Sequence, residues 1–371
     1  MVLIKMDQIP PETILDSDIF PHMNGGMPLL RKGAKVSKEY LDNLISRGVE
    51  GIYTSVNSSL VRKLAEERDF VKRANPPITN ELKGKAIGSL SDLFSAAAGS
   101  EVHDSARVVG EVEAVVDQLV TSIGSDRGTL VNISNLKSYD EYTYHHSLSV
   151  AVLSIAIGQY IGLDYRELNE LGKCAMMHDI GKRAVPIEII HKTSRLNDEE
   201  FTTIKGHSPL GYNYLLKENI GDEKLRKGVL CHHEKIDGTG YPHHLKGNEI
   251  PLWAKVISVA DVYDALTSNR PYRQPMQPSE AIEFVMGGVG SAFDFDIVSA
   301  FVEKVELYPA GSYIELSDGR TALVLNTKNN MRPVVRFTDN GKTGDLYYDR
   351  EFLSVVINRI IPEGEIPVYC R

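Results

Sequence analysis

The amino-acid sequence predicts a multidomain, mainly α-helical protein. We expect a central all-α helical bundle, preceded by a small α+β N-terminal module and followed by a small β domain. Three observations lead to this prediction. Residues 126 to about 305 form helical patterns joined by short loops. The first 56 residues have the pattern of short strands and turns around one helix, and from about residue 309 apolar residues alternate as in strands.

The N-terminal module is expected to span residues 1–75. Its clearest element is a helix in the segment SKEYLDNLISRG, which Ser37 can cap and Gly48 can end. The next segment, GIYTSV, has the pattern of a strand. His22 stands alone in a turn-rich stretch, so we expect no metal ligand here. The module is predicted to have a regulatory or interaction role.

A helical linker region is expected at residues 76–125, after a charged helix at about 58–74 and the proline-containing break ANPPITNE. Its second helix, about 102–123, carries an apolar stripe that predicts either core packing or the seam of a homodimer. His103 and Asp104 at its start are assigned to the helix N-terminus, because an acidic side chain is favoured there.

The central bundle, residues 126–307, contains most of the histidines. Nine of the 11 lie between positions 145 and 244. Candidate ligand positions 146, 178, 207, 232 and 261 are separated by 32, 29, 25 and 29 residues. Each gap fits one helix plus a return, so each ligand can come from a different helix of a bundle.

The C-terminal segment, residues 308–371, is expected to form a small β-barrel-like domain. The turn pairs Asp318-Gly319 and Asn340-Gly341 predict β-hairpins. Arg332 and Arg336 could contact an anion, but solvated surface charges are the favoured interpretation. No residue in this segment identifies a ligand.

Composition narrows the class of protein. A net charge of −9 disfavours a general DNA binder, which needs a basic surface. Three cysteines, Cys174, Cys231 and Cys370, are odd in number and lie in or beside apolar runs, which indicates reduced thiols. No apolar stretch approaches the about 20 residues of a membrane span, and the N-terminus has no signal-peptide layout. A cytoplasmic protein without a membrane span is therefore the prediction.

The run HHEKIDGTGYP at residues 232–242 concentrates metal-ligand side chains beside turn-forming glycines. Adjacent helical residues point about 100° apart, so His232 and His233 can serve one place only if it holds more than one ion or the helix ends there. Nitrogen and oxygen ligands with little thiolate suit iron, manganese or zinc. Such ions, held in pairs, are suited to the cleavage of phosphodiesters.

Three segments together resemble a known family: HDIGK at 178–182, HHEKIDGTGYP at 232–242, and DVYDALTSNRPYR at 261–273. They are similar to the HD-GYP family of bacterial cyclic-dinucleotide phosphodiesterases, a branch of the HD hydrolase superfamily, over about 126–305. The resemblance implies an HD-type bundle and hydrolysis of cyclic di-GMP to linear pGpG, with GMP as a further product left open. Two alternatives remain: a 3′,3′-cyclic GMP-AMP phosphodiesterase, and a non-catalytic nucleotide- or cyclase-binding scaffold.

The resemblance also implies two divalent transition-metal ions, with iron or manganese preferred. Their ligands would be His146, His178, Asp179, His207, His232, His233 and Asp261. His146 is favoured over His145 because it precedes the serine of the family pattern and shares a helix face with Val150 and Leu153. Family members with three metals have a glutamate four residues earlier, where this chain has Tyr142. Glu141 lies one position further away, so a third ion stays open.

The remaining site residues follow from the same resemblance. Asp179 and Lys182 are the expected catalytic residues, and Lys182 would meet a phosphate oxygen or protonate the leaving group. The expected substrate-binding residues are Lys182, Tyr241, Asp264, Arg270 and Arg273. Asp264, three residues after Asp261, can also support a ligand from the same helix face. The loop around Tyr241 could instead bind diguanylate cyclases. His191, His243 and His244 are expected to be surface residues.

Overall fold

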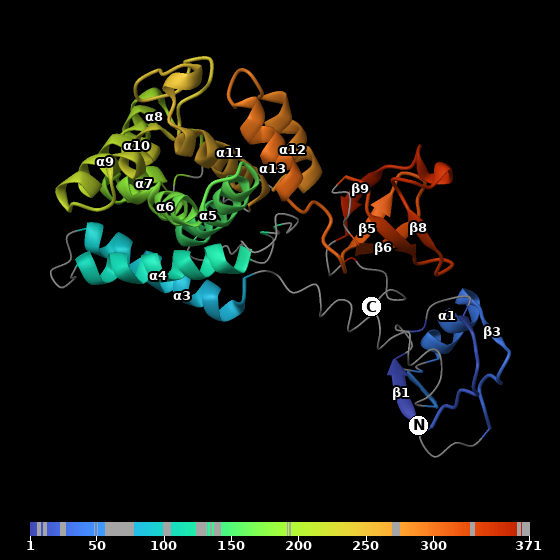
Figure 1. Cartoon of the computed structure of the whole chain (residues 1–371). Coiled ribbons are helices and arrows are strands. Elements are labelled where there is room, and N and C mark those ends of the chain that lie inside the picture. The colour runs from blue at the N-terminus through green and yellow to red at the C-terminus, as the bar shows by residue number, and fades with distance from the viewer. Residues whose placement is uncertain are drawn as a thin grey trace. The chain divides into compact units, whose positions relative to one another are not determined.

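A computed structural model of the chain divides it into two compact units, residues 1–75 with 307–371 and residues 76–306 (Figure 1). The structure describes the following residues: 1–5, 9, 13–22, 27–47, 49, 51–55, 78–98, 105–123, 131, 133, 136, 142–190, 192, 194–268, 275–326, 331–361 and 365. The sequence-based division into segments 1–75, 76–125, 126–307 and 308–371 stays a prediction.

The N-terminal part of the first unit combines short strands with one helix. Strand β1 (Val2–Lys5) pairs antiparallel with β4 (Gly51–Thr54), and β2 (Thr13–Ile14) pairs with β3 (Lys35–Val36). Helix α1 (Lys38–Ser46) begins after Ser37, whose hydroxyl accepts a hydrogen bond from the Tyr40 amide at 3.2 Å, as predicted. The predicted charged helix at about 58–74 lies outside the described residues.

The second unit is the helical bundle. Its helices in chain order are α3 (Asn80–Ala97), α4 (Ser105–Ile123), α5 (Tyr142–Tyr160), α6 (Tyr165–Met177), α7 (Ile187–Ile190), α8 (Asp198–Lys205), α9 (His207–Lys217), α10 (Glu223–Cys231), α11 (Leu252–Thr267), α12 (Pro278–Gly287) and α13 (Phe295–Lys304). Short 3₁₀ turns η3 (Ile180–Ala184) and η4 (Gly247–Glu249) lie between them. A mainly helical fold is therefore confirmed.

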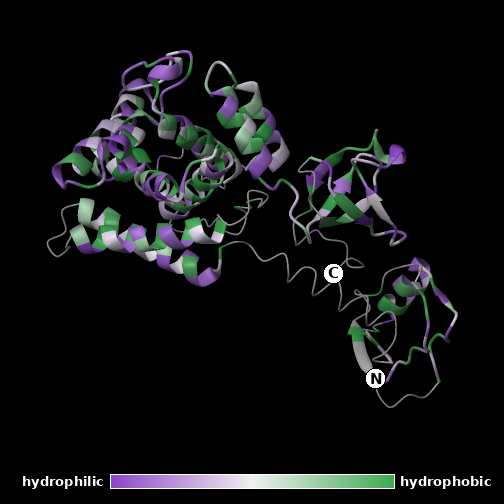
Figure 2. Ribbon diagram, viewed as in Figure 1, coloured by the Kyte–Doolittle hydropathy of each residue, from purple (hydrophilic) through white to green (hydrophobic). Residues whose placement is uncertain are grey.

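Helix α5 lies at the centre of the bundle and packs against α3, α6, α11 and α13. Its apolar residues from Leu148 to Ile157 are buried on every side, which explains its continuous apolar composition. The stripe on α4 is also buried, including Val112, Val116 and Leu119, and α4 packs against α3 and α6. In Figure 2, viewed as in Figure 1, the α4 ribbon carries both hydrophobic and hydrophilic residues. Of the two interpretations of this stripe, the structure supports core packing.

Helix ends follow the sequence signals. Asp164 caps α6 in a reciprocal capping box with Glu167, and Asn197 caps α8 in the same way with Glu200. These caps fix where α6 and α8 begin, and each helix leads directly to a candidate site residue. Helix α6 ends one residue before His178, and α8 ends two residues before His207.

The C-terminal part is a five-stranded antiparallel sheet. Strands β5 (Tyr313–Leu316), β6 (Thr321–Asn326), β7 (Val334–Phe337), β8 (Thr343–Asp345) and β9 (Ile357–Ile360) lie in the order β8-β7-β6-β5-β9. Gly319 and Gly341 have positive φ in the two predicted hairpin turns. Arg332 donates to the carbonyl oxygens of Leu346, Phe352 and Val355, so its role is structural. Closure of this sheet into a barrel stays a prediction.

None of the helices within the described ranges is both long and apolar enough to cross a membrane.

Candidate metal centre

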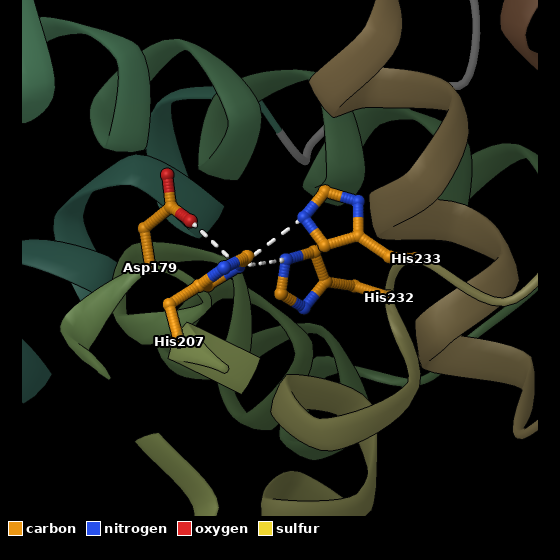
Figure 3. A group of neighbouring side chains, drawn as sticks. All are labelled: Asp179, His207, His232 and His233. Carbon is orange, nitrogen blue, oxygen red and sulfur yellow. Dashed lines mark hydrogen bonds and ion pairs between the residues drawn. The ribbon is translucent and has the colours of Figure 1, made fainter. Parts of the chain in front are cut away.

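Five candidate ligands lie at helix ends, where backbone direction changes. His178 and Asp179 follow α6 and lead into η3, His207 is the first residue of α9, and His232 and His233 follow the last residue of α10. His146 and Asp261 lie inside helices α5 and α11. Because α10 ends at Cys231, the two adjacent histidines are released from the 100° helical spacing and can both face one place. Figure 3 shows them together with Asp179 and His207.

Gly181 allows η3, the turn after α6, to pack closely against α9. A Cβ atom added to Gly181 would lie 1.9 Å from the His207 carbonyl oxygen and 2.5 Å from the Gly211 amide nitrogen. Only a residue without a side chain fits between these two backbones. This close approach sets the position of His178 and Asp179 relative to His207.

Hydrogen bonds fix the tautomer of three histidines. The Nδ1 atoms of His178, His207 and His232 lie 2.7, 2.6 and 2.7 Å from the backbone oxygens of the residues three positions earlier. A carbonyl oxygen only accepts, so each Nδ1 carries the proton and donates it. In a neutral ring the Nε2 atom then presents a lone pair, which is the arrangement of metal-binding histidines.

The Nε2 lone pairs of His207 and His232 face each other, and His233 and Asp179 lie beside them. The Nε2 atom of His207 lies 3.3 Å from Nε2 of His232 and 3.2 Å from Nε2 of His233, and 3.3 Å from Oδ1 of Asp179 (Figure 3). Burial lowers the pKa of His207, and burial together with the neighbouring His233 lowers the pKa of His232, so neither ring gains a second proton at neutral pH. Facing lone pairs repel each other unless a cation lies between them. The arrangement therefore fits a metal ion.

A second group shares Asp179. One ligand atom each from His146, His178 and Asp179 lie within 4.8 Å of one another, as do those of Asp179, His207, His232 and His233. The Nε2 atom of His146 is 3.2 Å from Asp261 Oδ1 and 3.6 Å from Asp179 Oδ2. Within the described part of the chain, His178 Nε2 and Asp179 Oδ1 are buried without a hydrogen-bond partner. Buried polar atoms of this kind need a partner, and a cation supplies one.

Asp264 orients His146, a member of the second group of ligands, through a hydrogen bond. His146 donates through Nδ1 to Asp264 Oδ2 at 2.7 Å, and the Ser268 hydroxyl donates to the same oxygen at 3.2 Å. Burial alone would lower the pKa of His146. Its hydrogen bonds to Asp261 and Asp264 have the larger effect and raise the pKa to about 9. A metal ion bound by His146 would take the place of the Nε2 proton, since a ligating imidazole must be neutral.

Asp179 stays ionised although it is 1% exposed. Burial raises the pKa of Asp179, but the Lys182 ammonium and His178 together hold it well below its usual range. Lys182 forms an ion pair with Asp179 Oδ2. The centre thus keeps an anionic carboxylate that faces both groups of imidazoles, as a site for divalent cations requires.

The centre opens to solvent on one side. The side chains of Asp261, His233 and Lys182 are 13%, 25% and 30% exposed, whereas the other ligands are nearly or fully buried. The Tyr241 ring lies beside His233, with ring centroids 4.8 Å apart and the planes tilted by 30°. Among the described residues, Lys182, His233 and Asp261 therefore form the exposed edge of the centre, and Tyr241 lies beside it.

The structure brings together most of the residues selected from the sequence: His146, His178, Asp179, His207, His232, His233, Asp261, Lys182, Tyr241 and Asp264. The neighbouring His145 instead makes a hydrogen bond to the Leu136 carbonyl oxygen at 2.7 Å. Glu141, Arg270, Arg273 and His191 lie outside the described residues. His243 and His244 are exposed, and Cys231 is buried against Ile250 and Ala254.

Two contributing residues received no role from the sequence. Ser268 supports Asp264, and Glu234 is buried behind the histidine pair. Ser268 lies four residues after Asp264 on the same helical face, a spacing that could have indicated it. Glu234 follows His233 directly, but its partners lie in a loop whose path the sequence does not give.

Comparisons with known proteins identify the domain family that contains this site. The HD domain family matches residues 131–297. A cyclic di-GMP phosphodiesterase of Pseudomonas aeruginosa is 39% identical over 57% of this chain, and the chain spans 51% of that relative's length. A cyclic di-GMP phosphodiesterase of Thermotoga maritima is 30% identical over 67% of this chain and 68% of the relative. A 3′3′-cGAMP-specific phosphodiesterase of Vibrio cholerae is 33% identical over 48% of this chain and 41% of the relative.

The fold is similar to that of a solved HDG"Y"P protein from Bdellovibrio bacteriovorus. The TM-score is 0.50 with 19% sequence identity, and the similarity covers 81% of this chain and 97% of the solved chain.

Proposed function

The chain belongs to the HD-GYP family of HD domain proteins, and from this premise we propose that it is a metal-dependent phosphodiesterase that hydrolyses cyclic di-GMP to linear pGpG. The observation that carries the proposal is the cluster around the His207 Nε2 atom, which lies 3.3 Å from Nε2 of His232, 3.2 Å from Nε2 of His233 and 3.3 Å from Oδ1 of Asp179. A cation between these atoms would provide a partner for all of them. Further cleavage to GMP is the open alternative for the final product.

Two divalent transition-metal ions are the proposed cofactors. The residues that would hold them are His146, His178, Asp179, His207, His232, His233 and Asp261. Imidazoles and carboxylates without thiolates favour iron or manganese. When bound, such ions polarise a phosphate oxygen and lower the pKa of water. A third ion would need Glu141.

Lys182 and Tyr241 are the proposed contacts to the substrate, together with Arg270 and Arg273. The Lys182 ammonium lies at the opening in an ion pair with Asp179. It can turn from Asp179 to a phosphate oxygen, or give a proton to the leaving oxygen. Tyr241 presents an aromatic ring beside His233 on the same side, and nucleobases stack on such rings. Asp264 orients His146 by its hydrogen bond.

A panel of dinucleotides tests the activity. Iron- or manganese-loaded protein is expected to convert cyclic di-GMP to pGpG with a higher kcat/KM than 3′,3′-cyclic GMP-AMP, because more of the similar relatives carry the first substrate in their names. A higher kcat/KM for cyclic GMP-AMP would support that alternative. Binding without any product from either dinucleotide would support the non-catalytic scaffold.

Metal analysis tests the cofactors. Protein purified without oxygen is expected to contain two transition-metal ions per chain. Removing them with a chelator should lower the melting temperature, since a ligand that binds only the folded protein stabilises it, and readdition should restore it. Protein that binds no metal, and melts at the same temperature with and without added iron or manganese, would refute the metal centre. Three ions would refute the two-metal assignment.

Lys182→Ala is expected to lower kcat about 10²-fold while the metal content stays at two ions per chain, because the substitution removes one charged donor but no ligand. Lys217→Ala is the matched control, since Lys217 is a highly exposed lysine in α9 with a side chain 82% exposed. A Lys182→Ala variant with wild-type kcat would show that Lys182 is only a solvated end of η3.

The expectations of a diguanylate cyclase partner at the loop around Tyr241, of a homodimer and of a cytoplasmic location stay predictions.

A further inference from the structure

Glu234 is a buried carboxylate that the proposed chemistry leaves unused. It follows His233 directly, beyond the end of α10, and is 2% exposed. Its own amide donates to the Cys231 carbonyl oxygen at 2.9 Å, which keeps the backbone turning after the helix ends. An ionised group at this depth needs hydrogen bonds to both oxygens.

Both oxygens accept hydrogen bonds from the backbone of the same loop. The His243 amide donates to Oε1 at 2.6 Å, and the Leu245 amide donates to Oε2 at 3.1 Å. These amides lie nine and eleven residues later in the chain, beyond Tyr241 and Pro242. Glu234 therefore closes the segment 234–245, here called the GYP loop, into a ring.

The GYP loop crosses its own beginning at Gly240. A Cβ atom at this position would lie 2.3 Å from the Lys235 amide nitrogen and 2.5 Å from the Glu234 Cα. The next residue, Tyr241, donates its amide to the His233 carbonyl oxygen at 3.2 Å and lays its ring beside the His233 ring. Tyr241 is thus held on one side by His233 and on the other by the residues that Glu234 binds.

Apolar contacts hold the other side of the loop. Ile236 and Leu245 pack against a small core cluster formed by Cys231, Ile250 and Ala254. The loop therefore has a fixed base, and the two hydrogen bonds of Glu234 hold the part of the loop next to the opening of the metal centre.

We propose that Glu234 is a positioning residue for substrate binding: by holding residues 243–245 it fixes the Tyr241 ring at the opening of the metal centre. This inference rests on the proposed function, since it takes Tyr241 as a substrate contact. Among the described residues, the hydrogen-bond partners of the Glu234 carboxylate are the His243 and Leu245 amides and not the ligand atoms. Its loss should therefore weaken substrate binding more than it slows the chemical step.

Glu234→Gln tests the proposal with little change of shape. The amide keeps one acceptor oxygen, but its NH₂ group meets a backbone N–H that needs an acceptor. An unsatisfied buried donor typically changes an equilibrium constant by roughly 5- to 150-fold. We expect KM for cyclic di-GMP to rise about tenfold, kcat to fall less than threefold, and the metal content to stay at the wild-type value.

Glu249→Gln is the matched control. Glu249 is an exposed glutamate that also accepts a backbone hydrogen bond, from the Lys246 amide at 2.9 Å, and a glutamine oxygen can replace it. Hydrogen exchange measured on peptides that cover residues 241–246 should be faster in Glu234→Gln than in the wild type, and unchanged in Glu249→Gln. This readout does not depend on activity. Unchanged exchange in Glu234→Gln would overturn the proposal.

A double-mutant cycle shows whether Glu234 acts through Tyr241. In a Tyr241→Ala background, Glu234→Gln should change KM less than twofold, because the ring it positions is gone. An undiminished tenfold effect there, or loss of metal in Glu234→Gln, would overturn the inference while the phosphodiesterase activity of the wild type stands. A wild type that hydrolyses no cyclic dinucleotide would instead refute the proposed function, and the inference with it.

Discussion

Asp179→Asn is expected to abolish both metal binding and hydrolysis. Asp179 is the one residue in both groups of ligand atoms, and its two oxygens face opposite sides: Oδ1 lies 3.3 Å from His207, and Oδ2 lies 3.3 Å from His178 and 3.6 Å from His146. Asparagine keeps the shape but removes the negative charge and replaces one oxygen by a donor. The set of ligands for a divalent ion would then contain one carboxylate, Asp261, instead of two.

The expected loss is large because the site is buried. Removing one partner from a buried ionic network typically costs about 3–5 kcal/mol, which corresponds to roughly 10²- to 10⁴-fold in rate. Hydrolysis of cyclic di-GMP and metal content per chain should be measured together. Asp164→Asn is the control, because Asp164 is an N-cap of the helix that leads to the site and asparagine caps equally well. Wild-type turnover by a metal-free Asp179→Asn protein would exclude the mechanism proposed above.

The ligand set could be predicted because its members are chemically distinctive and evenly spaced. Histidines at 146, 178, 207 and 232 recur about once per helix and return, so a bundle brings them together whatever its detailed packing. The structure agrees: each comes from a different helix or helix end. The choice of His146 over His145 rested on the helix face and on the family pattern, and His145 makes a hydrogen bond to Leu136 instead.

The supporting residues were harder to predict because their partners are backbone atoms. Glu234 binds two amides in a loop, and the histidine Nδ1 atoms bind carbonyl oxygens one turn earlier. Every residue except proline carries such an amide and every residue such a carbonyl, so no residue type marks them in the sequence. The path of the chain decides which amides and carbonyl oxygens lie near these side chains, and that path depends on tertiary packing.

The apolar stripe of α4 shows a similar limit. Its period predicted a helix with one buried face, and that was correct. Periodicity does not identify what covers the face, so a homodimer seam and an intramolecular core were equally compatible with Val112, Val116 and Leu119. The contacts of α4 with α3 and α6 decide for the core.

Gly181→Ala is expected to disrupt the centre without touching a ligand. The added methyl would lie 1.9 Å from the His207 carbonyl oxygen and 2.9 Å from the His207 carbonyl carbon, where real Cβ contacts are not found. Both obstacles are backbone, so neither can move by a rotamer change. The turn at 180–184 and the start of α9 must separate, which moves His178 and Asp179 away from His207.

The cost should be about 3–5 kcal/mol of unfolding free energy, as for severe overpacking at a buried position, and the protein that still folds should bind less metal. Gly84→Ala is the control with the opposite sign. Gly84 lies exposed in α3, where an added Cβ meets nothing within 4 Å, so alanine should stabilise the helix by about 0.5–1 kcal/mol. Chemical denaturation with metal titration measures both effects. Equal stability of the two variants would mean that Gly181 does not set the distance between the turn and α9, and that the packing of η3 is more adaptable than its contacts indicate.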